Sequence, residues 1–331
     1  MATARTEQIN LEATPYYHCM TRCVRRSYLC GVDSYNNRDY SHRKEWMVSR
    51  LKYLASVFAI KICAYAIMSN HYHVVLHVNE EEANTWNTEE IIHRWSSLFP
   101  KDAKQHQHLD SKIKLWRERL TSISWFMRCL NEPIARAAND EDECMGRFWE
   151  GRFKSQALLD EGALLSAMVY VDLNPIRAGL ALTPETSEFT SIYERIKMIA
   201  QQLNSKNKLK KNHPKPSVYD LLKQPKSLVP FANISENQVH AIDFKLSDYL
   251  ALVDCTGRII REDKKGAIPE HLIPILNRLR LDVRNWIPMI KHFESSFYHA
   301  IGNETQLLYF SQHRKWIAKG RTAARMFYKI A

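Results

Sequence analysis

Residues 64–78 read AYAIMSNHYHVVLHV, and this stretch decides the fold. An apolar run over 60–68 stops at Ser69 and Asn70, and a second apolar run follows over 71–78. Serine and asparagine favour turns, whereas β-branched residues favour strands. The pattern therefore predicts two adjacent strands joined by a tight turn.

The second of these strands carries two histidines. Side chains two apart on a strand point the same way, so His71 and His73 share one face while Tyr72 points to the other. Two imidazoles about 7 Å apart along a strand can bind one divalent metal ion, a frequent role of paired histidines. The alternative interpretation is a pair of buried or solvated histidines without a ligand. His77 shares the face but lies about 13 Å beyond His73, too far to bind the same ion.

The composition favours a nucleic-acid partner in a reducing compartment. The chain has 331 residues and a net charge of +11, which favours nucleic acid over an anionic membrane surface. No apolar run approaches the roughly 20 residues that span a bilayer, and residues 1–17 lack a hydrophobic signal core. The seven cysteines form no CxxC pair, so we expect neither a disulfide framework nor a zinc knuckle.

Periodicity predicts the elements around the hairpin. In order, they are a strand at 16–24, a helix at 39–58 with Ser41 as N-cap, the two strands, a helix at 111–139 bent at Pro133, a strand at 148–159, and a helix at 161–173 capped by Asp160. The order β-α-β-β-α-β predicts an α+β fold, a ferredoxin-like antiparallel sheet with its helices on one face. We interpret residues 80–110 as an inserted polar loop with one short helix, and QHQH at 105–108 as solvated.

Composition also predicts three regions along the chain. Residues 1–200 form the domain with the sheet, and 201–240 form a basic linker in which seven lysines face one acid between 201 and 230. Residues 241–331 form a mainly helical C-terminal domain. Whether this domain binds DNA, another partner or a second copy of the chain is open. Its expected helical segments are 247–261, 269–280, 285–301 and 304–329. We interpret its aromatic residues as a helical core rather than a base-stacking surface.

A tyrosine follows the last predicted strand, in AMVYVDLNPIRAGL at 167–180. Tyr170 and Asn174 are four apart and would share one helical face, although Pro175 biases Asn174 away from helical geometry. An activated tyrosine can form a covalent enzyme intermediate. A metal on His71 and His73 would stabilise charge on a scissile phosphate, and the Asn174 amide oxygen suits a third ligand. The alternative for Tyr170 is an ordinary core residue.

Three motifs now stand in order: HYH at 71–73, FWEGRFKS at 148–155, and YVDLNPIRAGL at 170–180. Over about residues 12–195 they resemble the single-tyrosine HUH transposases, and within that family the REP-associated tyrosine transposases of bacteria. The resemblance implies a metal-dependent nuclease with an HUH endonuclease core that acts on single-stranded DNA. It also implies a tyrosine that attacks a phosphodiester, stays joined to the 5′ phosphate and frees a 3′ hydroxyl before strand transfer.

The resemblance assigns roles to residues at matching positions. His71 and His73 match the metal-ligand histidines, Tyr170 matches the nucleophile four residues before Asn-Pro, and Asn174 stands where a polar third ligand is found. It implies Mg²⁺ or Mn²⁺ as the metal, hairpin DNA with a flanking single strand as the partner, and a cytoplasmic, nucleoid-associated enzyme of DNA transposition and recombination. This chain departs from compact members at the insertion, at the C-terminal extension, and at Tyr72, which replaces an aliphatic residue. Whether it is a monomer or a homodimer is open.

Several residues near the motifs suit contacts with DNA. Cationic side chains would follow the phosphate backbone without reading sequence, and one indole would stack on an unpaired base. The alternative interpretation is a solvated charge for each cation and a core residue for the indole. The candidates are Arg22, Arg25, Arg26, Arg147, Arg152, Lys154 and Trp149.

Two other functions are compatible with the sequence. One is a domesticated protein that binds a nucleic-acid hairpin without cutting it, which would shift DNA in a gel and leave no covalent adduct. The intact histidine pair together with Tyr170 argues against that interpretation. The other is a metal hydrolase that activates water, whose cleavage would need His71 and His73 but would survive Tyr170→Phe.

Overall fold

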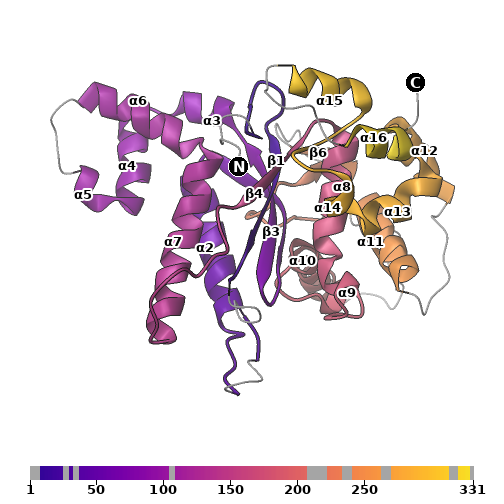
Figure 1. The fold of residues 1–331 in the computed structure, drawn as a ribbon, viewed down its shortest axis with the longest axis horizontal. Helices are drawn as coiled ribbons and strands as arrows, with labels where there is room; N and C mark the ends of the chain where they lie inside the picture. Colours follow the sequence, from indigo (N-terminus) through magenta and orange to yellow (C-terminus); the bar gives the residue numbers. More distant parts are fainter. Residues whose placement is uncertain are drawn as a thin grey trace.

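The computed structural model of the chain describes residues 8–24, 30–32, 37–103, 109–206, 222–232, 241–261, 270–312 and 320–328. Helices pack on both sides of a central sheet (Figure 1). The predicted α+β class is confirmed. Arg25, Arg26, the QHQH tract and most of the lysine-rich linker lie outside the described residues.

The central sheet has five strands in the order β2-β3-β1-β4-β7. The pairs β2–β3, β3–β1 and β1–β4 are antiparallel, but β7 runs parallel to β4. The sheet is therefore mixed, and the prediction of a wholly antiparallel sheet is wrong because the C-terminal region adds an edge strand. The strands are β1 (Tyr16–Arg22), β2 (Ile60–Ile67), β3 (His71–Val78), β4 (Lys154–Leu158) and β7 (Ala300–Ile301).

The hairpin at the centre of the sequence forms as predicted. Strands β2 and β3 pair from Ile60 opposite Val78 to Ile67 opposite Tyr72, and Ser69 and Asn70 make the turn. The Met68 N–H donates to the His71 carbonyl at 2.9 Å and closes that turn. Strand β1 then pairs with the free edge of β3, which places β3 in the interior of the sheet.

Two helices cover the face to which Tyr72 points, α2 (Arg43–Val57) and α7 (Ile123–Glu141). Helix α2 buries Met47, Leu51 and Leu54, spaced to share one side of a helix. Helix α7 follows the shorter α6 (Leu109–Leu120) after a break at residues 121–122, so the single long helix predicted over 111–139 is two helices. Helix α2 begins after His42 without a side-chain cap, and the predicted Ser41 N-cap is wrong.

The insertion is helical, which corrects the prediction of a loop with one short helix. It forms α3 (Glu80–Thr85), α4 (Thr88–Leu98) and α5 (Pro100–Ala103) before α6. The side chains of Asn79 and Asn87 accept hydrogen bonds from backbone N–H groups of Glu82 and Glu90, so asparagine caps begin α3 and α4. Trp95 of α4 is buried against Trp116 of α6, with ring centroids 5.8 Å apart.

The opposite face of the sheet is also covered, so the prediction of helices on one face is wrong (Figure 1). It carries α8 (Glu161–Asp172), α9 (Asn174–Arg177) and α10 (Ser191–Lys206). Every side chain of α8 from 162 to 172 is buried. A helix that is apolar all round needs partners on all sides. Here the sheet lies on one side, and α11 (Leu246–Ile260) and α13 (Trp286–Lys291) contact it from the other.

The C-terminal region is mainly helical, as predicted, but its third segment is not continuous. The predicted helix over 285–301 divides into α13 and α14 (Phe293–Ser296) and then extends into β7. Most of the aromatic residues there are buried as predicted, whereas the Tyr298 side chain is 55% exposed and Trp316 is not described. The remaining elements are β5 (Phe231–Ala232), β6 (Ile242–Lys245), η1 (Pro184–Thr186), η3 (Glu270–Leu272), η4 (Val283–Asn285), α12 (Ile273–Arg278), α15 (Glu304–Ser311) and α16 (Arg321–Phe327).

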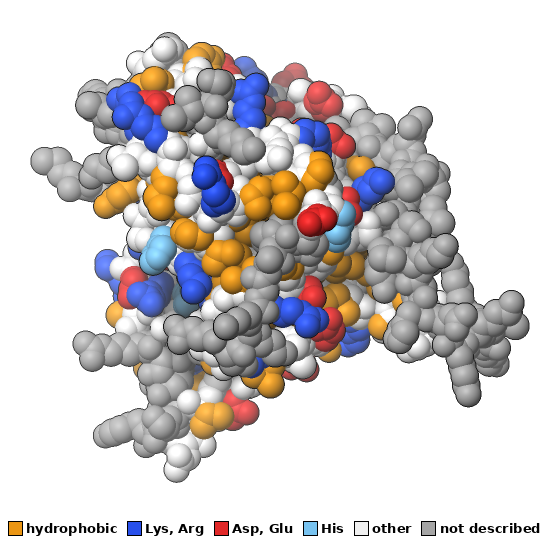
Figure 2. Space-filling model, turned by 90° about the vertical axis from the view of Figure 1, so that its right-hand side faces the viewer, with side chains coloured by type: hydrophobic (Ala, Val, Ile, Leu, Met, Phe, Trp, Pro, Cys, Tyr) orange, Lys and Arg blue, Asp and Glu red, His pale blue; other side chains and the backbone are white. Residues whose placement is uncertain are grey.

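The surface over the C-terminal side mixes charges rather than separating them. On the face in Figure 2, described lysine and arginine side chains lie among acidic and hydrophobic ones. This face therefore does not present one continuous basic patch in its described part, and DNA binding by the C-terminal helices stays a prediction. No helix among the described residues is long and apolar enough to cross a membrane.

Candidate active site

Strand β3 presents His71 and His73 on one face, as the spacing predicts. Their ring centroids are 5.0 Å apart and the rings are nearly perpendicular. Tyr72 points the other way, where its hydroxyl donates to the Asn131 side chain of α7 at 2.7 Å. His77 lies apart and stacks on Tyr16 at 4.6 Å. The strand thus separates two paired histidines from its other polar side chains.

Helix α8 brings Tyr170 to the same face. The Tyr170 ring centroid is 5.7 Å from that of His73, and the two rings are perpendicular. The helix begins where Asp160 accepts a hydrogen bond from the Ala163 N–H at 2.7 Å, so the predicted cap is confirmed. Residues from two motifs that are distant in the sequence therefore meet in one site.

The Tyr170 side chain is covered in this conformation. Only 3% of it is exposed, and its ring stacks on Phe293 of α14 at 4.7 Å. The Arg177 guanidinium lies 4.3 Å from the ring centroid. Burial and then the Glu294 carboxylate raise the pKa of Tyr170 to about 12, while Arg177 opposes the increase. The phenol is therefore protonated at neutral pH, and Arg177 is the neighbour that favours its ionised form.

Asn174 does not share a helix with Tyr170, which corrects the predicted common helical face. Helix α8 ends at Asp172, and Asn174 begins the short helix α9 after Leu173. Pro175 lacks the N–H that would continue the α8 ladder, although Asn174 before it is itself helical in α9. The Asn174 side chain is nevertheless buried, and its Nδ2 has no hydrogen-bond partner.

His18 of β1 completes the histidine cluster and was not singled out from the sequence. Its ring stacks on His73 with centroids 5.2 Å apart, and its Nε2 lies 3.0 Å from His73 Nδ1. His18 Nδ1 lies 2.7 Å from Gln156 Oε1 on β4. The only available signal was a histidine within a predicted strand, because its face depends on the register between β1 and β3.

Burial keeps the three imidazoles neutral. It lowers the pKa of His71 to about 4, with Arg22 as the next cause. It lowers the pKa of His73 well below the usual value, with His18 as the next cause. It also lowers the pKa of His18, against a hydrogen bond to Gln156. Neutral imidazole is the form that binds metal ions.

The hydrogen bonds around the histidines fit a metal ligated through Nε2. The His71 Nδ1 pairs with Asn70 Oδ1 at 2.6 Å, and the His73 Nδ1 pairs with His18. The His73 Nε2 is buried without a hydrogen-bond partner, an arrangement that native proteins rarely keep without a reason. In the described part of the chain, no three His, Cys, Asp or Glu side chains form a group suited to a metal. Asn174, whose amide oxygen is a suitable hard donor, stays the predicted third ligand.

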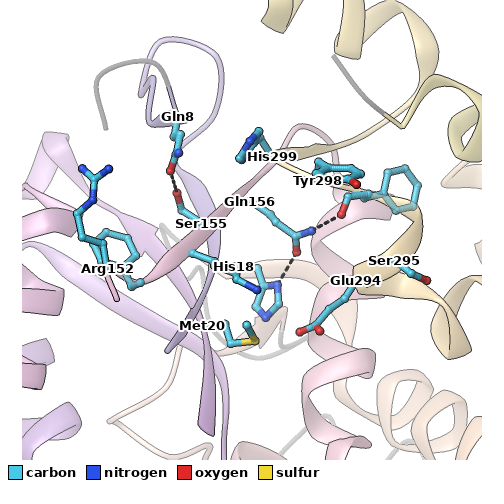
Figure 3. A pocket seen from close by; sticks show the side chains of 13 residues that line it. Gln8, His18, Met20, Arg152, Ser155, Gln156, Glu294, Ser295, Tyr298 and His299 are labelled. Atoms are coloured by element: carbon cyan, nitrogen blue, oxygen red, sulfur yellow. Dashed lines mark hydrogen bonds between the residues drawn. The ribbon is translucent and has the colours of Figure 1, made fainter. Parts of the chain in front are cut away.

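A cavity of about 800 Å³ opens beside His18 (Figure 3). Its lining includes His18, Gln156 and Glu294, together with Arg152 and Lys154 from the predicted DNA-binding set. The cavity lies between β4 and the segment 294–299, so the C-terminal region forms one of its walls. Two of the predicted cations therefore border a space that reaches the His18 ring.

The other predicted DNA-binding residues are distributed differently. Arg22 is exposed at the end of β1, in register with His71. Arg147 is exposed before β4, and its guanidinium donates to the Glu150 carbonyl at 3.4 Å. Trp149 is buried, and its indole N–H donates to the Asn131 carbonyl at 3.0 Å. The structure thus places Trp149 in the core behind Tyr72, away from the histidine face.

The C-terminal region supplies site residues that sequence reasoning missed. Glu294 Oε1 lies 3.6 Å from His73 Nδ1, and Phe293 covers Tyr170. Their positions follow from the pairing of β7 with β4, which brings this region to the site. Arg177 was also missed, although it lies inside the quoted motif.

Comparison with known proteins gives a likeness to a solved structure. No family model matches the chain, and no curated protein matches it. A solved structure described as a REP-associated tyrosine transposase bound to a REP hairpin is similar over 57% of this chain and 81% of that one, with 12% identity and a TM-score of 0.36. These values are too low to establish a shared fold or function, so the family stays a prediction from the sequence motifs.

Proposed function

We propose that the protein is a metal-dependent transposase that cleaves and rejoins single-stranded DNA beside hairpin elements through a 5′-phosphotyrosine intermediate. The observation that carries the proposal is the meeting of His71, His73 and Tyr170 on one face of the sheet. The strand order β2-β3-β1-β4, with its antiparallel pairs, is also that of a ferredoxin-like β-α-β-β-α-β unit. Both observations agree with the HUH resemblance of the sequence.

The residues divide the chemistry among them. His71, His73 and Asn174 would hold Mg²⁺ or Mn²⁺, which supplies a Lewis acid to the scissile phosphate when bound. The Tyr170 phenol gives its proton to the adjacent Glu294 carboxylate, and its oxygen forms a bond to phosphorus. The bond from phosphorus to the 3′ oxygen breaks, and that oxygen takes up the proton from Glu294 and leaves as a 3′ hydroxyl. Arg177 stabilises the developing phenolate.

The cavity beside His18 is the route that we propose for the DNA strand. Arg152 and Lys154 at its border would pair with backbone phosphates, which makes binding sensitive to salt but not to sequence. Arg22 would meet the strand at the end of β1, next to His71. A bacterial, nucleoid-associated enzyme in the cytoplasm is the setting that this function implies.

The test is a covalent-adduct assay with hairpin oligonucleotides from the flanks of the gene, in Mg²⁺ or Mn²⁺. A phosphotyrosine to the 5′ phosphate predicts that a 3′ label moves with the protein on a denaturing gel, whereas a 5′ label leaves on a shorter fragment. Tyr170→Phe and EDTA should each abolish the adduct. Tyr16→Phe is the matched control, because Tyr16 stacks on His77 outside the site. Cleavage that persists in Tyr170→Phe would instead favour a hydrolase that activates water.

A second candidate is a protein that binds a nucleic-acid hairpin without cutting it. The covered state of Tyr170, with Phe293 stacked on it and its pKa raised to about 12, favours this candidate. It predicts a shifted DNA band with both wild type and Tyr170→Phe, and no adduct with either label. An adduct on the 3′-labelled strand would eliminate it.

A further inference from the structure

A chain of hydrogen bonds runs from the C-terminal region to His73. The Gln156 Nε2 lies 2.8 Å from the Phe297 carbonyl oxygen, and the Gln156 Oε1 lies 2.7 Å from His18 Nδ1. The His18 Nε2 then lies 3.0 Å from His73 Nδ1. Figure 3 shows the contact between Gln156 and His18 at the edge of the cavity. Each of these hydrogen bonds is buried.

The chemistry of the groups fixes the direction of every bond. A carbonyl oxygen only accepts, so the Gln156 amide must direct its nitrogen to Phe297 and its oxygen to His18. An amide oxygen also only accepts, so His18 Nδ1 carries a proton. His18 is almost completely buried, which favours the neutral imidazole and leaves a lone pair on Nε2. The proton between the two rings therefore belongs to His73 Nδ1.

The same reasoning determines the other nitrogen of His73. A neutral imidazole with a proton on Nδ1 has its lone pair on Nε2. This Nε2 is the buried atom without a hydrogen-bond partner. The Glu294 carboxylate, 3.6 Å from His73 Nδ1, also favours a proton on Nδ1. His18 and Glu294 therefore both lie on the Nδ1 side of His73. The lone pair on Nε2 stays available to bind a metal ion.

We propose that His18, oriented by Gln156 and the Phe297 carbonyl, is a positioning residue that holds His73 in the tautomer needed to bind the metal through Nε2. The metal part of this inference rests on the proposed function, whereas the tautomer does not. Hydrogen bonds of this kind from a second residue orient histidine ligands and raise their basicity, and their loss typically weakens metal binding about 10- to 100-fold. Besides Glu294 and Phe293, the C-terminal region thereby contributes the Phe297 backbone carbonyl to the site.

The first experiment reads the tautomer directly. Full-length protein labelled with ¹⁵N-histidine is examined by long-range ¹H–¹⁵N NMR without metal, and His73→Gln identifies the His73 signals. We expect a protonated Nδ1 and an unprotonated Nε2 on His73. His18→Phe keeps an aromatic ring against His73 but removes the acceptor, so the signals should change to a mixture of tautomers. A protonated Nε2 in wild type would overturn the proposal.

Two substitutions at Gln156 separate the hydrogen-bond chain from simple packing. Gln156→Leu removes the acceptor for His18 and should disturb the His73 tautomer. Gln156→Glu, protonated in this buried position, can accept from His18 and donate to the Phe297 carbonyl, so it should restore the wild-type spectrum. If Gln156 only packs against its neighbours, Gln156→Leu and Gln156→Glu should give the same His73 tautomer in the NMR spectrum. That result would overturn the proposal.

The second experiment measures metal affinity without a substrate. Free Mn²⁺ is followed by electron paramagnetic resonance during titration of wild type, His18→Phe, Gln156→Leu and Gln156→Glu. We expect Mn²⁺ binding to be about 10- to 100-fold weaker in His18→Phe and Gln156→Leu. In Gln156→Glu it should be near wild type. His77→Phe is the matched control, a buried histidine on the same face of β3 but stacked on Tyr16.

The two measurements distinguish the possible failures. Unchanged Mn²⁺ affinity in His18→Phe would overturn the positioning role while leaving the metal site in place. A wild-type protein with the expected tautomer but no Mn²⁺ or Mg²⁺ binding would support the hydrogen-bond chain and overturn the metal-dependent function. Thermal melting of each variant checks that the fold is intact before either result is interpreted.

Discussion

Tyr72 and His73 are neighbours on β3, yet they point into surroundings of opposite character. Tyr72 enters the layer of α2 and α7, where its hydroxyl bonds to Asn131 and its ring contacts Trp149. His73 enters the layer of α8 and the C-terminal region, where its Nε2 is buried without a partner. Among the residues that the structure describes, no buried side-chain nitrogen or oxygen on the first face lacks a hydrogen-bond partner, as expected of a structural core. The second keeps unpaired polar atoms beside a buried tyrosine.

The difference indicates where stability and chemistry are located. Unpaired buried polar groups cost free energy, so a fold tolerates them mainly where they have a use. The Tyr72 face can therefore be treated as scaffold and the His73 face as site. This division predicts that substitutions on the first face change stability without changing metal binding, and that substitution of the histidines on the second changes metal binding.

Phe126→Ala should have the largest effect on stability. Phe126 of α7 is fully buried on the Tyr72 side and packs edge-to-face on Phe58 at 5.4 Å. Removing a buried phenyl ring typically costs about 3–5 kcal/mol. Urea unfolding followed by circular dichroism measures this loss. In conditions where the variant is folded, its Mn²⁺ affinity should match wild type, and a weaker affinity would contradict the division between the faces.

His73→Ala should have the largest effect on metal binding. It removes the ligand whose Nε2 is unpaired, so Mn²⁺ binding should weaken by at least about 100-fold. Titration of Mn²⁺ by electron paramagnetic resonance provides the measurement, and His77→Ala on the same strand face is the control. Equal losses in both variants would show a general disturbance of β3 rather than the loss of a ligand.

Asp172, on the His73 side of the sheet, should make the free energy of unfolding of the protein depend on pH. It is fully buried in α8 and accepts hydrogen bonds from Tyr249, Ser191 and the Ile192 N–H. Burial raises its pKa from 3.8 to about 6, against those hydrogen bonds. Because the folded pKa is the higher one, the native state holds the proton more tightly. The stabilisation that comes from proton binding at Asp172 is complete below about pH 4 and is lost as pH rises through about 6.

The Asp172→Asn variant isolates this contribution. The shift corresponds to a change on the order of 3 kcal/mol in the free energy of unfolding, measured by urea unfolding between pH 4 and pH 7. His18, His71 and His73 have lowered pKa values and act in the opposite direction, so the quantity to follow is the difference between wild type and Asp172→Asn. A difference that does not vary with pH would contradict the raised pKa.

The sequence predicted one side of this comparison better than the other. The alternation in β3 correctly separated Tyr72 from His71 and His73, because strand geometry has a fixed period of two. Periodicity also located α2, whose buried positions repeat along the helix. The Asp160 cap and the Asn174-Pro175 stop located α8. These features depend on neighbours within one element, which a local pattern can report.

The missed features depend on contacts between distant parts of the chain. His18 joins the site only through the register of β1 against β3, and Glu294 only because β7 pairs with β4. No local pattern near residue 300 predicts a two-residue parallel edge strand. The insertion was missed for a different reason, since its helices are short and start at asparagine caps that also suit turns. Metal binding and the role of Tyr170 stay predictions.

Tyr72→Phe should have the smallest effect and tests the division most directly. It removes one hydroxyl from the residue adjacent to both histidines and leaves the Asn131 oxygen without that donor. A lost buried hydrogen bond of this kind costs about 1 kcal/mol, which urea unfolding can resolve. The ring remains, so β3 should keep its register, and the His73 tautomer and Mn²⁺ affinity should equal those of wild type. A change in either property would mean that the scaffold face transmits strain to the histidines through the strand, and that the two faces are not independent.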